Sequence, residues 1–163
     1  MRGMLVAIAL AGVAPTRVLA QRYDYHLLLD STVSAARVVL LGTGHQAAGV
    51  ERRGDGVSQE SFTTVLPDSL GAPGSAPLGV VMLGSNDRVT RIVLSAEGSG
   101  SDSVAVTTGA RYLVRRLTAI FGPPLTPGDQ SDWCWSTPRR FIDLALDRTA
   151  GSVSLTLAYG PPN

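Results

Sequence analysis

The alternating pattern near the end of the sequence restricts the possible folds of the chain more than any other feature. Between Phe141 and Tyr159, two runs alternate strictly between apolar and polar residues. The apolar positions are Ile142, Leu144 and Leu146 in the first run, and Val153, Leu155, Leu157 and Tyr159 in the second. A period of two is the period of a β-strand, and Gly151 suits the turn between the runs. We therefore predict an antiparallel hairpin with one apolar face that another element must cover.

The segment just before this hairpin predicts the covering element. Apolar residues recur there at spacings of three and four, which is typical of an amphipathic helix over about 107–121. The stripe consists of Ala110, Leu113, Leu117 and Ile120. Thr107 or Thr108 is the expected cap, and Gly122 with the two following prolines ends the helix. Arg116 is expected at the edge of the stripe or in solvent.

Upstream of this helix the pattern indicates mostly β-structure. Hairpin signals lie at Gly84–Asp87 and at Asp55–Gly56, and residues 23–29 alternate like a strand. The segments 67–77 and 97–103 are rich in turn residues and are expected to be loops. Residues 32–41 fit either a short helix or a buried strand.

These patterns together predict an α+β fold. The sheet is antiparallel, mostly hairpin-connected and about six to eight strands wide, with the helix over about 107–121 packed on one face. A second short helix near 32–41 is the open alternative. The helix, the sequence "FGPP" and a tryptophan-bearing strand resemble small α+β domains of bacterial envelope proteins, including those with the β-lactamase-inhibitor-like layout. The resemblance covers only the C-terminal part of the chain, and no functional residue is carried over from it.

The first twenty residues have the features of a signal peptide. Arg2 precedes an apolar run over 4–14, which is too short to span a bilayer of about 30 Å, and Val18 and Ala20 suit a signal-peptidase site. We predict cleavage before Gln21, with residues 21–163 forming a single α+β domain. No stable membrane anchor is then expected, and the mature protein is expected in the bacterial periplasm or outside the cell.

Charge and cysteine content exclude several classes of partner. The mature chain would carry twelve arginines (14 minus Arg2 and Arg17) against 13 acidic side chains, a net charge of −1. Such a chain has no basic stripe for phosphates, so we expect no nucleic-acid partner. All the basic residues are arginine, which suggests GC-rich bacterial coding. Cys134 is the single cysteine, so no internal disulfide is expected.

The most distinctive cluster is "WCWSTPRR", residues 133–140. In a strand, Trp133 and Trp135 share one face and Cys134 points to the other, so either the indoles or the thiol face inward. Both indoles in the core is one interpretation. The other is an exposed indole that forms a flat stacking surface beside Arg139 or Arg140. On the second interpretation, Trp133, Trp135, Arg139 and Arg140 are the candidate residues for binding a protein or a glycan.

Catalytic motifs are weak, and neither a cofactor nor a metal is expected. An alternative function is a small secreted hydrolase that uses Asp129, Asp132, Asp143 or Asp147 with the histidines His26 and His45. A purely structural accessory domain is a third possibility. Gly42, Gly44 and Ala47 match a dinucleotide-binding pattern, but the glycines that follow interrupt the required helix, so a tight loop is expected there. A non-enzymatic binding domain is the first hypothesis.

Overall fold

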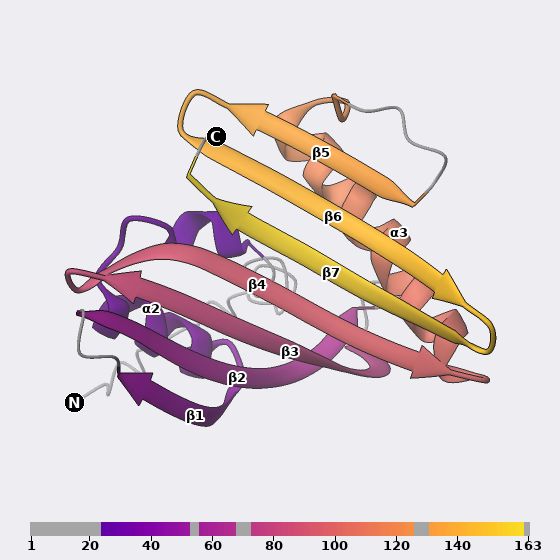
Figure 1. Cartoon of the computed structure of the whole chain (residues 1–163), viewed down its shortest axis with the longest axis horizontal. Helices are drawn as coiled ribbons and strands as arrows, with labels where there is room; N and C mark the ends of the chain where they lie inside the picture. The colour runs from indigo at the N-terminus through magenta and orange to yellow at the C-terminus, as the bar shows by residue number, and fades with distance from the viewer. Residues whose placement is uncertain (1–23, 53–55, 68–72, 126–130, 162–163) are drawn as a thin grey trace, which may run out of the picture.

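The computed structural model describes residues 24–52, 56–67, 73–125 and 131–161. The predicted signal peptide lies outside these residues. The chain has an α+β fold, in which seven antiparallel strands form one sheet and the helices lie together on one face of it (Figure 1). The elements in chain order are η1 (Tyr25–Leu28, a 3-10 helix), α2 (Val33–Gly42), β1 (Gln46–Arg52), β2 (Val57–Pro67), β3 (Pro73–Ser85), β4 (Arg88–Ser99), α3 (Asp102–Phe121), β5 (Asp132–Thr137), β6 (Arg140–Thr149) and β7 (Ser152–Gly160).

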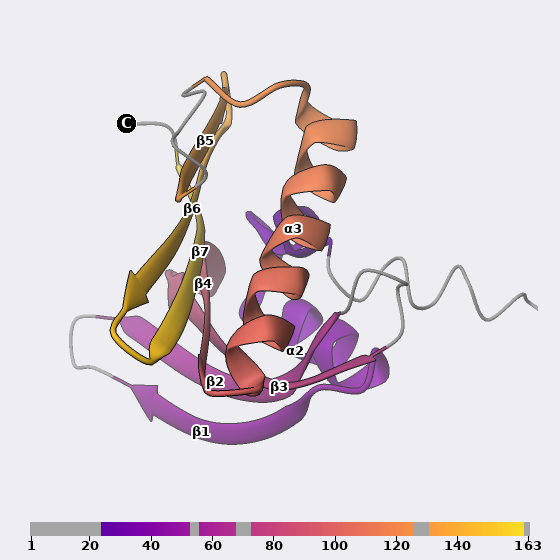
Figure 2. The ribbon, with the colours of Figure 1, turned by 90° about the vertical axis from the view of Figure 1, so that its right-hand side faces the viewer.

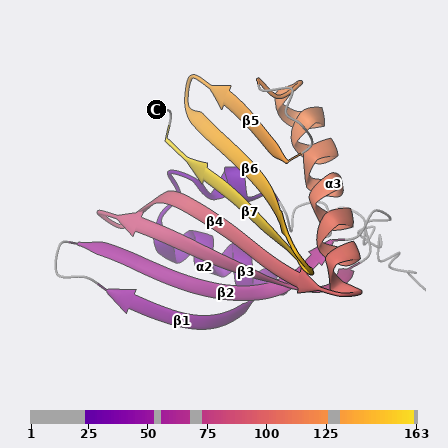
Figure 3. The same ribbon diagram turned by 45° about the vertical axis from the view of Figure 1, so that its right-hand side comes forward.

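The order of the strands across the sheet is β1-β2-β3-β4-β7-β6-β5. Strand β7 therefore lies between β4 and β6, and α3 carries the chain from the end of β4 to the far edge at β5 (Figure 3). The sheet twists and curls around α2 and α3, leaving its other face uncovered (Figure 2). The apolar residues between the helices and the sheet form the hydrophobic core. Within the described residues, no helix has both the length and the apolar character needed to cross a membrane.

The predicted hairpins are confirmed. Strands β6 and β7 pair from Phe141 to Thr149, and Gly151 in their turn has a φ of 88°. The β3–β4 turn places Asn86 and Asp87 at φ values of 52° and 60°, which is the backbone geometry of a tight type I′ hairpin. Strands β1 and β2 also pair, and of their predicted turn residues Gly56 has a φ of 81° while Asp55 lies outside the described residues.

The long helix α3 confirms the predicted amphipathic element but begins five residues earlier. Asp102 starts it, and neither Thr107 nor Thr108 is its cap. The turn-rich segment 97–103 is therefore mostly strand end and helix start, because Val106 extends the buried stripe by one turn. The buried stripe is Val106, Ala110, Leu113 and Leu117. Ile120 was expected in this stripe but is 43% exposed, and in the last turn of the helix Phe121 packs against the core instead.

Arg116 lies at the edge of the buried stripe, which is one of the two positions predicted for it. Its guanidinium forms a bidentate ion pair with Asp24, with Nη2–Oδ1 and Nη2–Oδ2 distances of 2.6 and 2.8 Å. Both side chains are largely shielded from water. Arg116 therefore joins the start of the described chain to α3.

The N-terminal predictions are corrected in two places. Residues 25–28 form a 3-10 helix instead of a strand, with Tyr25, Leu28 and Leu29 buried and Leu27 exposed. The loop predicted over 67–77 is shorter, because β3 already begins at Pro73. The open alternative over 32–41 is resolved as helix α2, capped by the Thr32 hydroxyl, which accepts the Ala35 N–H.

The glycine-rich segment after α2 is a loop, as predicted. Gly44 has a φ of 88°, and strand β1 follows it directly. The dinucleotide-binding pattern would require a helix in that place. Gly42, Gly44 and Ala47 therefore only close α2 and start the sheet.

Candidate functional site

Strand β5 directs its two indoles toward the core side of the sheet. Trp135 is 1% exposed, and its Nε1–H donates to the carbonyl of Gly122 at 3.0 Å. Trp133 is half-buried and packs against the same core. A buried indole cannot offer a flat stacking surface to a ligand. Trp135 is therefore a core residue and not a candidate for ligand binding. Trp133 faces the same way and does not join Arg139 or Arg140 in one surface.

Cys134 lies on the opposite face, as strand alternation requires. It pairs across the strands with Asp143 and has no disulfide partner. The thiol is half-buried. Burial and then the neighbouring Asp143 carboxylate raise the pKa of the Cys134 thiol, and this disfavours the thiolate needed for nucleophilic chemistry.

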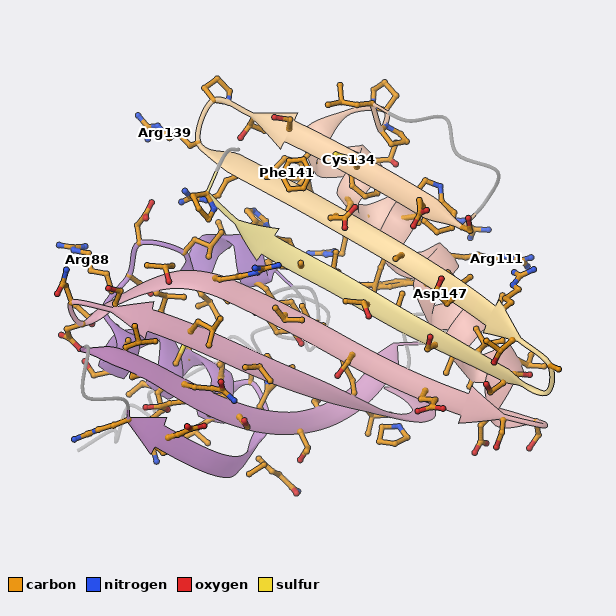
Figure 4. All side chains as sticks on the ribbon, viewed as in Figure 1. Arg88, Arg111, Cys134, Arg139, Phe141 and Asp147 are labelled. Carbon is orange, nitrogen blue, oxygen red and sulfur yellow. The ribbon has the colours of Figure 1, made fainter. Side chains whose placement is uncertain are left out.

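The uncovered face of the sheet carries mixed side chains, and we call it the open face. Figure 4 shows Cys134, Phe141 and Asp147 on this side of β5 and β6. Its residues on β3 to β7 are Val81, Leu83, Arg91, Val93, Ser95, Asp132, Cys134, Ser136, Phe141, Asp143, Ala145, Asp147, Thr156 and Ala158. The apolar members are only half-exposed.

A depression of about 340 Å³ lies on this face, and we call it the face pocket. It is lined by Arg91, Phe141, Asp143, Ala158, Gly160 and Pro161. Pairing explains why these residues meet: Phe141 lies opposite Gly160, and Asp143 lies opposite Ala158. Because glycine and alanine add little volume, the Phe141 ring and the two charged side chains border an open floor. The pocket thus combines an aromatic ring with one cation and one carboxylate.

A second depression, of about 330 Å³, adjoins the first at the end of β7, and we call it the β7 notch. It is lined by Leu29, Asp30, Thr90, Arg139, Arg140, Gly160 and Pro161. The pairing of β7 with β4 ends at Tyr159, and its pairing with β6 ends at Gly160. Strand β4 continues beyond this point, because it begins at Arg88. Pro161 cannot donate a backbone hydrogen bond to continue the ladder, so β7 stops and a gap opens between its neighbours.

Asp30 organises the base of this notch. It has a φ of 67°, which is uncommon outside glycine, and its N–H donates to the Val89 carbonyl at 2.9 Å. Its own carbonyl accepts Nη1–H of Arg88 at 2.6 Å, and its carboxylate accepts Nη2–H of Arg140 at 2.9 Å. Because three separate bonds hold it, Asp30 keeps an unfavourable backbone angle and positions two arginines.

Arg139 occupies the tip of the β5–β6 hairpin, at the rim of the notch (Figure 4). Strand β5 ends at Thr137, directly before Pro138. Among the described residues no ion pair or hydrogen bond of its guanidinium is found. The predicted residues Arg139 and Arg140 thus meet in one depression, and neither tryptophan lines it.

The other sequence candidates do not converge. Asp129 lies outside the described residues, and Asp132 and Asp147 occupy different strand positions of the open face. His45 is a buried residue whose Nδ1 donates to the Leu40 carbonyl at 3.1 Å, while Nε2 accepts from the Tyr25 hydroxyl at 2.9 Å. Within the described part of the chain, no group of three or more His, Cys, Asp or Glu side chains is placed to hold a metal ion.

His26 is the second histidine, and its environment predicts a pH-dependent stability. Its ring packs edge-on against Phe121 at a centroid distance of 5.1 Å, and Nδ1 is buried with no hydrogen-bond partner in the described structure. Burial lowers the pKa of His26; Asp24 opposes this, while Arg116 and Arg140 lower it further. The folded state therefore favours the neutral ring, and the unfolded chain binds the proton first.

We expect the free energy of unfolding to fall as the pH is lowered through about 6.5, the ordinary histidine pKa. Above that pH the His26 contribution is complete. Urea unfolding measured between about pH 8 and about pH 5 should show a shallower fall for His26→Gln than for the wild type. Identical slopes for the two proteins would show that His26 is not responsible.

Comparison with protein-family models, with curated proteins and with solved structures finds no match to this chain. The site therefore has to be interpreted from its own geometry.

Sequence reasoning missed Arg91, Phe141 and Asp30 as site residues. The strand alternation did contain a signal for Phe141, because it placed this aromatic residue on the polar side of its strand. Arg91 and Asp30 come from distant parts of the chain, and only the pairing of β4 with β7 and the docking of η1 bring them to Phe141 and Arg140. No local pattern marks such residues.

Proposed function

We propose that this chain is the binding domain of an exported bacterial protein, that it is not an enzyme, and that it recognises a glycan at the face pocket. The observation that carries the proposal is the combination of the Phe141 ring with Arg91 and Asp143 around an open floor. A sugar ring has flat C–H faces and an edge of hydroxyl groups. An aromatic ring suits the former, and a carboxylate and a guanidinium suit the latter.

The size and position of the pocket support this proposal. A volume of about 340 Å³ lies at the lower end of the range for small-ligand sites and leaves room for one or two sugar units. Phe141 sits on a paired strand and is half-buried, so part of its side-chain freedom is already lost before a ligand binds. The remaining sugar units of a longer glycan would extend along the open face.

The distribution of apolar surface favours a glycan over a protein partner. Protein interfaces usually centre on large exposed apolar side chains. In the described residues, such side chains are found on η1, α2, β1 and α3 and in Leu125, and none belongs to the open face. A ligand with many hydroxyl groups matches a face whose apolar side chains are half-buried and whose exposed groups are polar.

A matched pair of aspartates tests the proposal. Asp143 and Asp147 lie on the same face of β6, but only Asp143 lines the face pocket. Calorimetry of the mature protein with neutral and carboxylated di- and oligosaccharides would provide the affinities. Asp143→Asn should weaken binding about tenfold or more, because a hydrogen bond to a charged group is lost, while Asp147→Asn should leave it unchanged.

Phe141→Ala should weaken binding by a similar factor without unfolding the protein, since its ring is only half-buried. Equal behaviour of the two aspartate variants would show that the face pocket is not the site. Absence of binding to every saccharide, together with tight binding to a protein from the same compartment, would contradict a glycan ligand.

A further inference from the structure

We propose that the β7 notch is an anion subsite, and that it takes the carboxylate of an acidic sugar whose ring lies in the face pocket. This inference rests on the glycan-binding function proposed above. It names the class of glycan, which is one that contains uronic acids or similar carboxylated units. The argument depends on charge, on preorganisation and on the contact between the two depressions.

Positive charge exceeds negative charge in the notch. Arg139 and Arg140 line it and Arg88 is bound to its base, whereas Asp30 is the one carboxylate among its lining residues. The nearby Asp87 lines a different depression, beside Arg52 and Glu60. Asp143 belongs to the adjoining face pocket, where Arg91 balances it. A negative ligand group is therefore favoured in the notch over a neutral or positive one.

Arg140 and Arg88, two of the three arginines at the notch, are held in place before any ligand arrives. Arg140 donates to the Asp30 carboxylate and also, through Nη1, to the Arg139 carbonyl at 2.8 Å. Arg88 is fixed by the Asp30 carbonyl. Because these bonds already restrict the side chains, less conformational entropy is lost when an anion binds. Arg139 supplies an additional guanidinium fork, whose geometry matches a carboxylate.

The two depressions are contiguous, since Gly160 and Pro161 line both. Gly160 has no side chain, and an added Cβ would meet no atom within 4 Å, so no other group fills the space beside it. A carboxylate attached directly to a sugar ring in the face pocket can therefore reach the arginines of the notch. The Thr90 hydroxyl and the apolar side chain of Leu29 complete the lining.

The experiment uses the mature protein and four defined probes: D-glucuronate, D-glucose, acetate and hexaglutamate. Binding is followed by NMR shifts of the arginine side-chain N–H groups. Glucuronate should bind about tenfold tighter than glucose, because charge-assisted hydrogen bonds are added. Arg139→Gln should remove this preference while leaving glucose binding unchanged. Arg111→Gln, on an exposed arginine in the middle of α3 and far from Arg139 (Figure 4), should have no effect.

The outcomes separate this inference from the proposed function. If Arg139→Gln keeps the preference for glucuronate while Asp143→Asn still weakens glucose binding, the anion subsite is wrong and glycan binding stands. If acetate shifts the notch arginines but neither sugar binds, the sugar assignment of both proposals fails. Hexaglutamate binding tighter than glucuronate would identify an acidic protein instead and overturn the inference. A preference for glucuronate over glucose that weakens as the salt concentration is raised supports the anion subsite.

Discussion

Trp135→Ala is expected to destabilise the protein by about 3–5 kcal/mol, a large part of a typical stability of about 5–15 kcal/mol. Trp135 is the largest fully buried side chain in the described residues. Its removal leaves a cavity between β5 and the end of α3, and the Gly122 carbonyl loses the indole N–H that it accepts. The free energy of unfolding, measured in urea, would give the loss directly.

Trp133→Ala is the matched control, because it removes the same side chain from the same face of the same strand. Trp133 is only half-buried, so its loss should be distinctly smaller. Trp135→Phe separates the two contributions at Trp135, since it keeps most of the apolar volume and removes only the hydrogen bond. If the two alanine variants lost equal stability, the packing of β5 described above would be wrong.

Leu117→Asp is expected to unfold the domain or to lower its stability by at least about 4 kcal/mol. Leu117 is 3% exposed and lies in the buried stripe of α3. The substitution removes a well-packed side chain and also places a carboxylate where no cation is available within the core cluster. Thermal melts and near-ultraviolet circular dichroism would detect the loss of tertiary structure.

Ala119→Asp is the control for this variant. Ala119 is exposed on the same turn of α3, so the same carboxylate should cost no more than about 1 kcal/mol there, mainly through the helix dipole. Arg116 would be a poor control, because its ion pair with Asp24 contributes to stability in its own right. Similar melting temperatures for the Leu117 and Ala119 variants would mean that another side of α3 faces the sheet.

Much of the architecture could be predicted from local pattern. The hairpins and α3 were recognisable because each has a strict period and a turn or stop signal beside it. The alternating runs of β6 and β7 each had one apolar face, which required a cover, and α3 had the one apolar stripe long enough to provide it. The orientation of the "WCW" segment was undecided, because alternation separates the two faces of a strand without saying which one is inside.

The candidate site was also predicted only in part from the sequence. Arg139 and Arg140 were predicted because they lie near an unusual cluster, but the tryptophans of that cluster belong to the core. Alternation assigned Phe141 and Asp143 to the correct face of their strand. The one local sign that Phe141 lies in a site was the position of an aromatic residue on the polar side. Local physics thus determined which side chains share a face. It could not determine which faces meet, because that depends on the order of the strands across the sheet.

Sequence alone determined the α+β class, the antiparallel hairpins and the helix that covers the sheet, because these follow from periodicities of two and 3.6 within short segments. Tertiary structure decided where the chain presents its charges. Strand β7 is inserted between β4 and β6 and stops at Gly160, next to a proline that cannot extend the ladder. That non-local pairing, together with the docking of Asp30 from the η1–α2 connection, brings residues 30, 91 and 139–143 together. Contacts so distant in sequence are selected by the packing of the whole core, and no short stretch of the chain encodes them.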